Sequence, residues 1–180
     1  DVSRSILETV QNNLGTAGVE VDEVEVDGYQ GTDLVHAHKT VLAYEASRTR
    51  VVEYENYVEQ LSKQFFDLIE QGRQIDHAQY REALKQRDAA NRRLNTELAH
   101  YDLFLTPSAL GEAPHGLSST GDPVFSRAWN LLGGPAITLP AGTGGKGLPL
   151  GVQLVGHSDS DDDLIAHARW MYQNILSGNL

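Results

Sequence analysis

The hydrophobic positions in the first fifty residues predict two helices with an extended segment between them. An apolar stripe at three- and four-residue spacing predicts a helix that stops near Gly15, and the stripe consists of Ile6, Leu7, Val10 and Leu14. Residues 19–26 alternate valine with acidic residues and change phase once, which predicts a strand with a bulge. Residues 33–50 return to helical spacing.

Two further helices are predicted over residues 58–99. The first should end at Gly72, and its apolar stripe consists of Val58, Leu61, Phe65, Leu68 and Ile69. The second should be capped by Asp76 and run to about Ala99, with a thin stripe, because the segment from Lys85 to Arg93 offers only two alanines. A helix this polar cannot be buried on all sides, so we interpret residues 58–99 as a helical hairpin that lies on the body of the protein or projects from it.

Short apolar runs replace the long helices after residue 101. Strands are predicted over 103–106, 136–139 and 150–155, and the first ends at Pro107. A loop rich in Gly, Ser and Pro covers 107–123, and Pro123 suits the first turn of a helix that reaches about Leu132. A last amphipathic helix follows the acidic residues 159–163 and continues to about Leu176. The predicted class is α/β, with a mixed sheet flanked by helices and the hairpin protruding from it.

Composition narrows the class of protein. The chain has 180 residues, of which 40% are hydrophobic and 22% are charged, as expected for one globular domain. Its net charge of −11 disfavours binding to nucleic acid. No apolar run approaches the roughly 20 residues of a membrane span and no leader is visible, so we expect a cytoplasmic protein with no membrane partner. Cysteine is absent, which excludes disulfides and thiolate chemistry.

Four local patterns resemble binding or catalytic sites without meeting their requirements. The glycines of 142–147 match a dinucleotide-binding pattern, but a strand follows them where a helix is needed. The acidic run from Asp159 lacks the glycine and the glutamate of a calcium loop. Asp33, His36 and His38 are candidate metal ligands, but a metal site is disfavoured because His36 and His38 are two residues apart and point to different faces of a helix. A catalytic triad is disfavoured because one short loop holds all three members: His115, Ser118 and Asp122. We therefore expect neither a metal nor a cofactor.

The second half of the chain contains four distinctive segments. They are YDLFLTP at 101–107, GDP at 121–123, WNLLGGPAITLPAG at 129–142 and GLPLGVQLVG at 147–156. Their sequences, order and short gaps, with the helix that follows, resemble the C-terminal part of the amidase signature family. The resemblance is strongest over 101–176 and looser over 33–50, where AYEA at 43–46 looks similar to a family helix. It implies that residues 1–180 are the C-terminal part of an amidase domain with a partial amidase-signature fold.

The resemblance implies hydrolysis of amides by a Ser-Ser-Lys triad, in which a lysine relays protons through one serine to a nucleophilic serine. In the family, the triad and a Gly/Ser-rich signature precede the segments found here. None of the four lysines stands in such a context: Lys39, Lys63, Lys85 and Lys146. No catalytic residue can therefore be assigned, and we expect the chain alone to be inactive.

Part of a substrate pocket remains predicted, because α/β proteins bind ligands at strand ends and in the loops beyond them. The candidates are Thr106, Pro107, Ser108, Trp129 and Asn130. Core packing is the alternative for Trp129, and a hydrogen bond within the helix or loop is the alternative for Asn130.

Two functions stay open at this point. The chain is either the C-terminal portion of an amide hydrolase or a non-catalytic interaction or oligomerisation module on an amidase scaffold. In the first case its partners are the missing N-terminal half and, in the full-length protein, a small amide substrate; a homo-oligomer fits either case. A piece of a larger sheet should expose an unpaired strand edge and an apolar patch, whereas an evolved module should cover them with charge.

Overall fold

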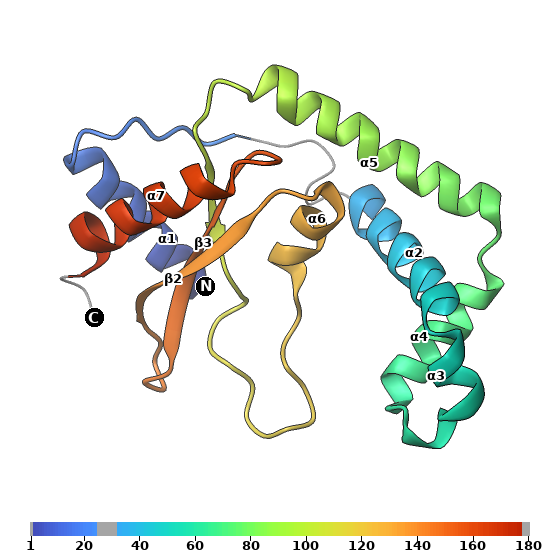
Figure 1. The fold of residues 1–180 in the computed structure, drawn as a ribbon. Helices are drawn as coiled ribbons and strands as arrows, with labels where there is room; N and C mark the ends of the chain where they lie inside the picture. The colour runs from blue at the N-terminus through green and yellow to red at the C-terminus, as the bar shows by residue number, and fades with distance from the viewer. Residues whose placement is uncertain (1, 25–31, 178–180) are drawn as a thin grey trace. The chain divides into compact units, whose positions relative to one another are not determined.

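The computed structural model describes residues 2–24 and 32–177, which divide into two compact units (Figure 1). The sheet unit combines the N-terminal segment with the residues after 93, and the helical unit lies between them in sequence. The elements of the sheet unit are α1 (Val2–Thr16), β1 (Phe104–Pro107), α6 (Val124–Leu132), β2 (Ala136–Thr143), β3 (Pro149–Val155), α7 (Asp161–Met171) and a π-helical turn (Tyr172–Leu176). Those of the helical unit are α2 (Thr32–Thr49), α3 (Val51–Asn56), a 3-10 turn (Val58–Gln60), α4 (Lys63–Gln74) and most of α5 (His77–Glu97). The predicted α/β class is confirmed.

The three strands form one sheet in the order β1-β3-β2. The central position of β3 places Gln153 opposite Thr106 of β1 on one side and opposite Thr138 of β2 on the other. A bulge interrupts β2 between Pro140 and Gly142. Every pairing between the described strands is antiparallel, a more regular arrangement than the mixed sheet that we expected.

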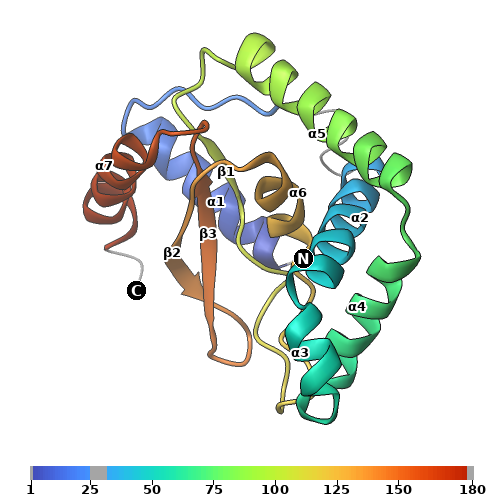
Figure 2. The same cartoon turned by 45° about the vertical axis from the view of Figure 1, so that its right-hand side comes forward.

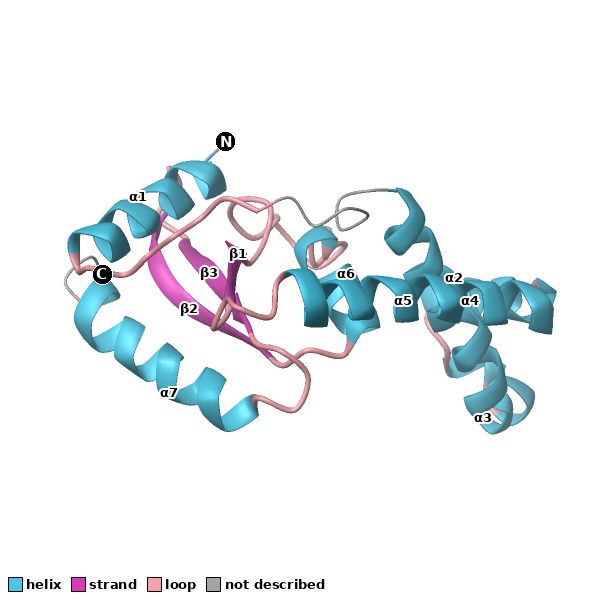
Figure 3. Cartoon of the chain, turned by 90° about the horizontal axis from the view of Figure 1, so that it is seen from above, coloured by secondary structure: helices cyan, strands magenta, loops and turns pink. Residues whose placement is uncertain are grey.

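One face of the sheet carries the hydrophobic core of this unit. Val152 and Leu154 point to this face and are fully buried. Helices α1 and α7 lie on that side of the strands and α6 on the other (Figures 1 and 3). The core consists of Val10, Leu14, Leu139, Ala141, Val152, Leu154, Leu164, Ala168, Met171, Ile175 and Leu176. The apolar stripes predicted near both ends of the chain therefore pack on the same sheet.

Helix α6 is attached to the opposite face of the sheet. The rings of Trp129 and Phe104 stack with their centroids 5.5 Å apart. The side-chain amide of Gln153 donates to the backbone oxygen of Phe125, in the first turn of α6, at 3.3 Å. An aromatic contact and a hydrogen bond thus hold α6 against β1 and β3.

Helices α2 and α4 lie side by side in the helical unit (Figures 1 and 2). Gly72 is buried in their interface, where an added Cβ would lie 1.8 Å from the backbone oxygen of Ala43. The prediction that Gly72 ends its helix is wrong, because α4 continues to Gln74 and uses the glycine for close approach. The helix also begins later than predicted, after Ser62, whose hydroxyl accepts from the backbone N–H of Phe65. The close pair is α2 with α4, rather than the predicted hairpin of α4 with α5.

The start of α5 agrees with its predicted cap. The carboxylate of Asp76 accepts from the backbone N–H of Gln79 at 2.8 Å, and the Gln79 side chain accepts from the N–H of Asp76 at 2.9 Å. This reciprocal pair satisfies two N–H groups that a helix leaves without partners at its start.

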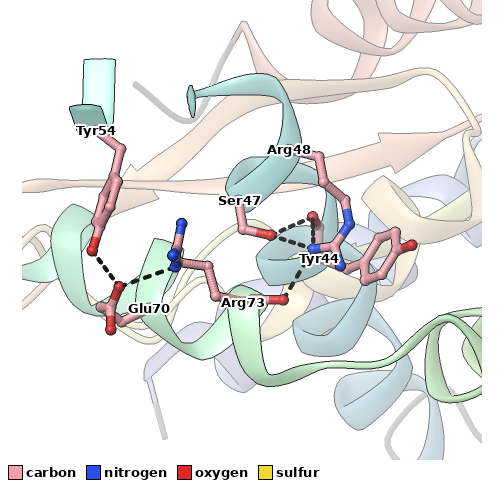
Figure 4. A network of polar contacts seen from close by, with 7 residues as sticks. Tyr44, Ser47, Arg48, Tyr54, Glu70 and Arg73 are labelled. Carbon is pink, nitrogen blue, oxygen red and sulfur yellow. Dashed lines mark hydrogen bonds and ion pairs between the residues drawn. The ribbon is translucent and has the colours of Figure 1, made fainter. Parts of the chain in front are cut away.

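A polar network joins α2 to the end of α4 (Figure 4). The guanidinium of Arg48 donates to the Gly72 oxygen at 3.1 Å and to the Ser47 hydroxyl at 2.6 Å, and it lies 3.5 Å from the centroid of the Tyr44 ring. Arg48 therefore supplies a second donor to the Gly72 carbonyl near the C-terminal end of α4, which also accepts from the backbone N–H of Ile75 at 3.3 Å.

The strand predicted over 19–26 is absent from residues 19–24, and residues 25 and 26 lie outside the described residues. Val19 and Val21 are 36% and 38% exposed, and neither is paired in the sheet. Asp22 instead accepts a hydrogen bond from the Tyr101 hydroxyl at 3.1 Å. Among the described helices, none has an apolar stretch long enough to cross a lipid bilayer.

Candidate functional site

Polar side chains gather on the sheet face to which α6 is attached. The strand register brings Thr106, Gln153 and Thr138 into one row, with one residue from each strand. Ser108 follows two residues after Thr106 and lies on the same face. We call Thr106, Ser108, Thr138 and Gln153 the polar strip.

Gln153 is the buried member of the polar strip, with 6% of its surface exposed. Its Nε2 donates to the Thr106 hydroxyl at 3.4 Å and to the Phe125 backbone oxygen at 3.3 Å. Both partners are acceptors toward this nitrogen, so they fix the orientation of the side-chain amide. The Oε1 atom of Gln153 is then the group that can accept a further hydrogen bond.

Gly151 gives the polar strip its shape. An added Cβ at Gly151 would lie 2.8 Å from the Thr138 methyl group and 2.9 Å from the Ser108 hydroxyl. The Ser108 hydroxyl donates to the Gly151 oxygen at 2.9 Å, which anchors the start of the loop that follows β1. A larger residue at 151 would therefore occupy the space between these two side chains.

Of the five predicted site residues, the structure places Thr106 and Ser108 in the polar strip, whereas Pro107 pairs with Val152 and belongs to the other face of the sheet. Thr106, Pro107 and Ser108 run along the end of β1 and are half-buried. Trp129 is only 4% exposed and packs on Phe104, in agreement with the packing alternative. Asn130 is exposed on α6. That these five residues contact a substrate stays a prediction.

Sequence reasoning missed Gln153 and Thr138. Each had a signal, because Gln153 is the single polar residue in the apolar run Leu150–Val155 and Thr138 stands between two apolar residues of β2. Only the register shows that the two residues stand opposite each other on β2 and β3.

The chemistry available in the polar strip is hydrogen bonding without proton transfer near neutral pH, since hydroxyl and amide side chains do not titrate there. Such groups can bind the carbonyl and the N–H of an amide. The local triad fails structurally as well, because His115 and Ser118 are exposed and Asp122 forms an ion pair with Arg127 at 3.1 Å. In the described part of the chain, no group of three His, Asp or Glu side chains could hold a metal ion.

All four lysines lie at the surface. Lys39 and Lys146 are exposed, and the side chains of Lys63 and Lys85 are 82% and 69% exposed in ion pairs with neighbouring acids. A lysine that acts as a base must lose its proton at working pH, and burial is the usual cause of the lower pKa that this requires. None of these four positions provides such burial.

Comparison with known proteins places the chain among amidases. A family model described as Amidase matches residues 1–165. A glutamyl-tRNA(Gln) amidotransferase subunit from Neisseria gonorrhoeae (strain ATCC 700825 / FA 1090) is 37% identical over 103 residues, which cover 54% of this chain and 21% of that protein. The corresponding mitochondrial protein from Homo sapiens is 32% identical over 95 residues, which cover 48% of this chain and 18% of that protein.

Solved structures share the fold. A crystal structure of an amidase superposes with a TM-score of 0.83 at 24% identity, covering 96% of this chain and 42% of that one. The substrate complex of 6-aminohexanoate cyclic dimer hydrolase gives a TM-score of 0.75 at 16% identity and covers 96% of this chain and 41% of that one. The chain thus spans about a fifth of the length of the curated relatives and about two fifths of the solved structures.

Proposed function

Because the chain belongs to the amidase family, we propose that it is the C-terminal part of an amide hydrolase and that the polar strip forms one wall of its substrate pocket. In the proposed reaction, a serine of the remaining part attacks the carbonyl carbon of a small carboxamide, and ammonia or an amine leaves. Water then releases the carboxylate from the acyl-serine. The Ser-Ser-Lys residues belong to that remaining part, so the chain alone is inactive.

The observation that carries this proposal is that the side chains of the polar strip are uncharged hydrogen-bonding groups. Thr106, Ser108, Thr138 and Gln153 can donate to and accept from an amide, but they include neither a general base nor an activated nucleophile. The exposure of all four lysines supports the same division, in which binding groups lie in this chain and the proton-relaying lysine lies elsewhere.

The edges of the sheet also support a larger assembly. With the order β1-β3-β2, each outer strand has one side that no other described strand pairs with. Unpaired edges favour the addition of further strands. The remaining part of the amidase fold is the partner that this proposal assigns to those edges.

The first test measures ammonia released by the purified chain from glutamine, asparagine and benzamide. We expect no release above the buffer rate, because the chain lacks the base and the nucleophile. Saturable release that disappears in Ser118→Ala would overturn the proposal and establish a catalytic serine within the 107–123 loop.

The second test measures the intact mass of the protein in its source cells with an antibody against residues 76–99. A species much heavier than 19.7 kDa would support a full-length amidase that contains this chain. A species near 19.7 kDa would contradict the proposal and favour the interaction or oligomerisation module on the same scaffold.

A further inference from the structure

The turn between β2 and β3 binds a carboxylate from a distant part of the chain. The backbone N–H groups of Lys146 and Leu148 both donate to Oε1 of Glu112, each at 2.9 Å. The Lys146 N–H also lies 3.3 Å from Oε2 of the same carboxylate. The Lys146 contacts use its main-chain nitrogen, so this is a backbone site for a carboxylate rather than an ion pair.

The shape of the turn fits this carboxylate. An added Cβ at Gly144 would lie 2.4 Å from the carboxylate carbon of Glu112, so only glycine leaves room for the side chain. The turn itself is closed by the Gly144 N–H, which donates to the Leu148 oxygen at 2.8 Å, and by the Gly147 N–H, which donates to the Gly144 oxygen at 3.0 Å. Hydrogen bonds from backbone N–H groups to a carboxylate are stronger than those between neutral groups.

Glu112 belongs to the loop that starts at the polar strip, and the same loop segment has two other attachments. The hydroxyl of Ser3, a buried residue of α1, donates to the Ala109 oxygen at 3.0 Å and accepts from the Gly111 N–H at 2.7 Å. The hydroxyl of Ser108 bonds to Gly151 in β3. Residues 108–112 are therefore held by α1, by β3 and by the β2–β3 turn, whereas residues 113–122 are exposed.

We propose that Glu112 is a positioning residue for the proposed pocket wall, and this inference rests on the proposed function above. Its carboxylate fixes the loop beyond β1, and the loop in turn fixes the position and orientation of the Ser108 side chain at the end of the polar strip. The β2–β3 turn acts as a carboxylate receptor whose ligand is part of the same chain.

Hydrogen–deuterium exchange of the full chain tests this proposal. Glu112→Ala should accelerate exchange of the amides in 144–148 and 108–112 by about tenfold or more, because charge-assisted hydrogen bonds are lost. Glu112→Gln should give a smaller increase, because it keeps one acceptor oxygen. Lys146→Ala should leave exchange unchanged, since the site uses the backbone. In the Glu112→Ala protein, added formate should slow amide exchange in the β2–β3 turn again, because formate can occupy the carboxylate site that Glu112 leaves empty.

The matched control is Glu55→Ala, which removes an exposed glutamate in the helical unit and should leave both segments unchanged. Unchanged exchange in Glu112→Ala, or equal acceleration throughout the sheet unit, would refute a positioning role. If Glu112→Ala does not fold, Glu112→Gln decides, and exchange equal to that of the wild type in both segments counts against the proposal. No turnover is measured, so this result is independent of the ammonia assay that tests the proposed function.

Discussion

Replacing Gly72 by alanine should separate α2 from α4. The new methyl group would lie 1.8 Å from the Ala43 oxygen, 2.4 Å from the carbonyl carbon of Ala43 and 2.9 Å from Cβ of Ser47. Two of these three neighbours are backbone atoms, which cannot rotate away as the end of a side chain can. The helices would have to move apart by roughly 1.5 Å to restore ordinary van der Waals contact.

The cost can be estimated from three contributions. Overpacking of a buried contact costs about 3 kcal/mol, near the upper end of the usual range, because backbone is involved. Loss of the Arg48 hydrogen bond to the Gly72 oxygen adds about 1 kcal/mol. Alanine returns about 1 kcal/mol through its higher helix propensity. The net destabilisation is therefore about 3 kcal/mol, which is large for a short helical unit.

Urea unfolding followed by far-UV circular dichroism measures this change, because most of the helical unit consists of helix. With a denaturant dependence of about 1 kcal/mol per molar urea, the midpoint should fall by about 3 M, or the helices should fail to form without denaturant. Gly15→Ala is the matched control, since Gly15 also lies in a helix but no atom is within 4 Å of its added Cβ. The Gly15→Ala protein should keep the wild-type midpoint, or its free energy of unfolding should rise by up to about 1 kcal/mol. A Gly72→Ala protein with the wild-type midpoint would refute the proposed helix contact.

Three further changes test other contacts. Ser62→Ala removes the acceptor for the Phe65 N–H at the start of α4, so it should lower the free energy of unfolding by about 1 kcal/mol, and an equal urea midpoint would contradict this. Gln153→Met removes the donor that joins the sheet to α6, so the free energy of unfolding should fall by about 1 to 2 kcal/mol when unfolding is followed by tryptophan fluorescence. Wild-type stability would show that these long hydrogen bonds contribute little. The hydrogen bond to the Glu45 carboxylate raises the pKa of Tyr80, so the stabilisation is complete below pH 10, roughly the ordinary tyrosine pKa, and is lost as the pH rises through the higher folded pKa. Glu45→Gln should therefore shift part of the tyrosinate absorbance to lower pH, and superimposable titration curves would exclude this cause.

Hydrophobic periodicity correctly predicted the elements that bury one face lined by regularly spaced apolar residues. The helices α1, α2 and α7 and the three strands all appear where the spacing of apolar residues indicated them. The cap at Asp76 was also predictable, because its partner Gln79 lies three residues away in the sequence. Local spacing is sufficient in these cases because the interacting residues are neighbours along the chain.

Predictions failed where the deciding partner is distant in sequence. Gly72 can end a helix or allow close approach, and only the presence of Ala43 on α2 distinguishes these roles. The valine alternation over 19–26 is a sound strand pattern, but a strand also requires a neighbour, and β1, β2 and β3 pair with one another instead. The contact between Glu112 and the β2–β3 turn spans 34 residues to Lys146 and has no local signature.

In the candidate site, Thr106 and Ser108 were predicted from the sequence, whereas Gln153 and Thr138 were not. The register of β3 explains this difference. Because successive residues face opposite sides, the pairing that buries Val152 and Leu154 under α1 and α7 also brings Gln153 between Thr106 and Thr138. A slip of one residue would place the amide of Gln153 in the apolar core, so the packing of the core also fixes which residues of β3 face α6. Hydrophobicity alone could identify the residues of the core between the sheet and helices α1 and α7. The polar residues of the opposite face are recognisable as one row only when the register is known.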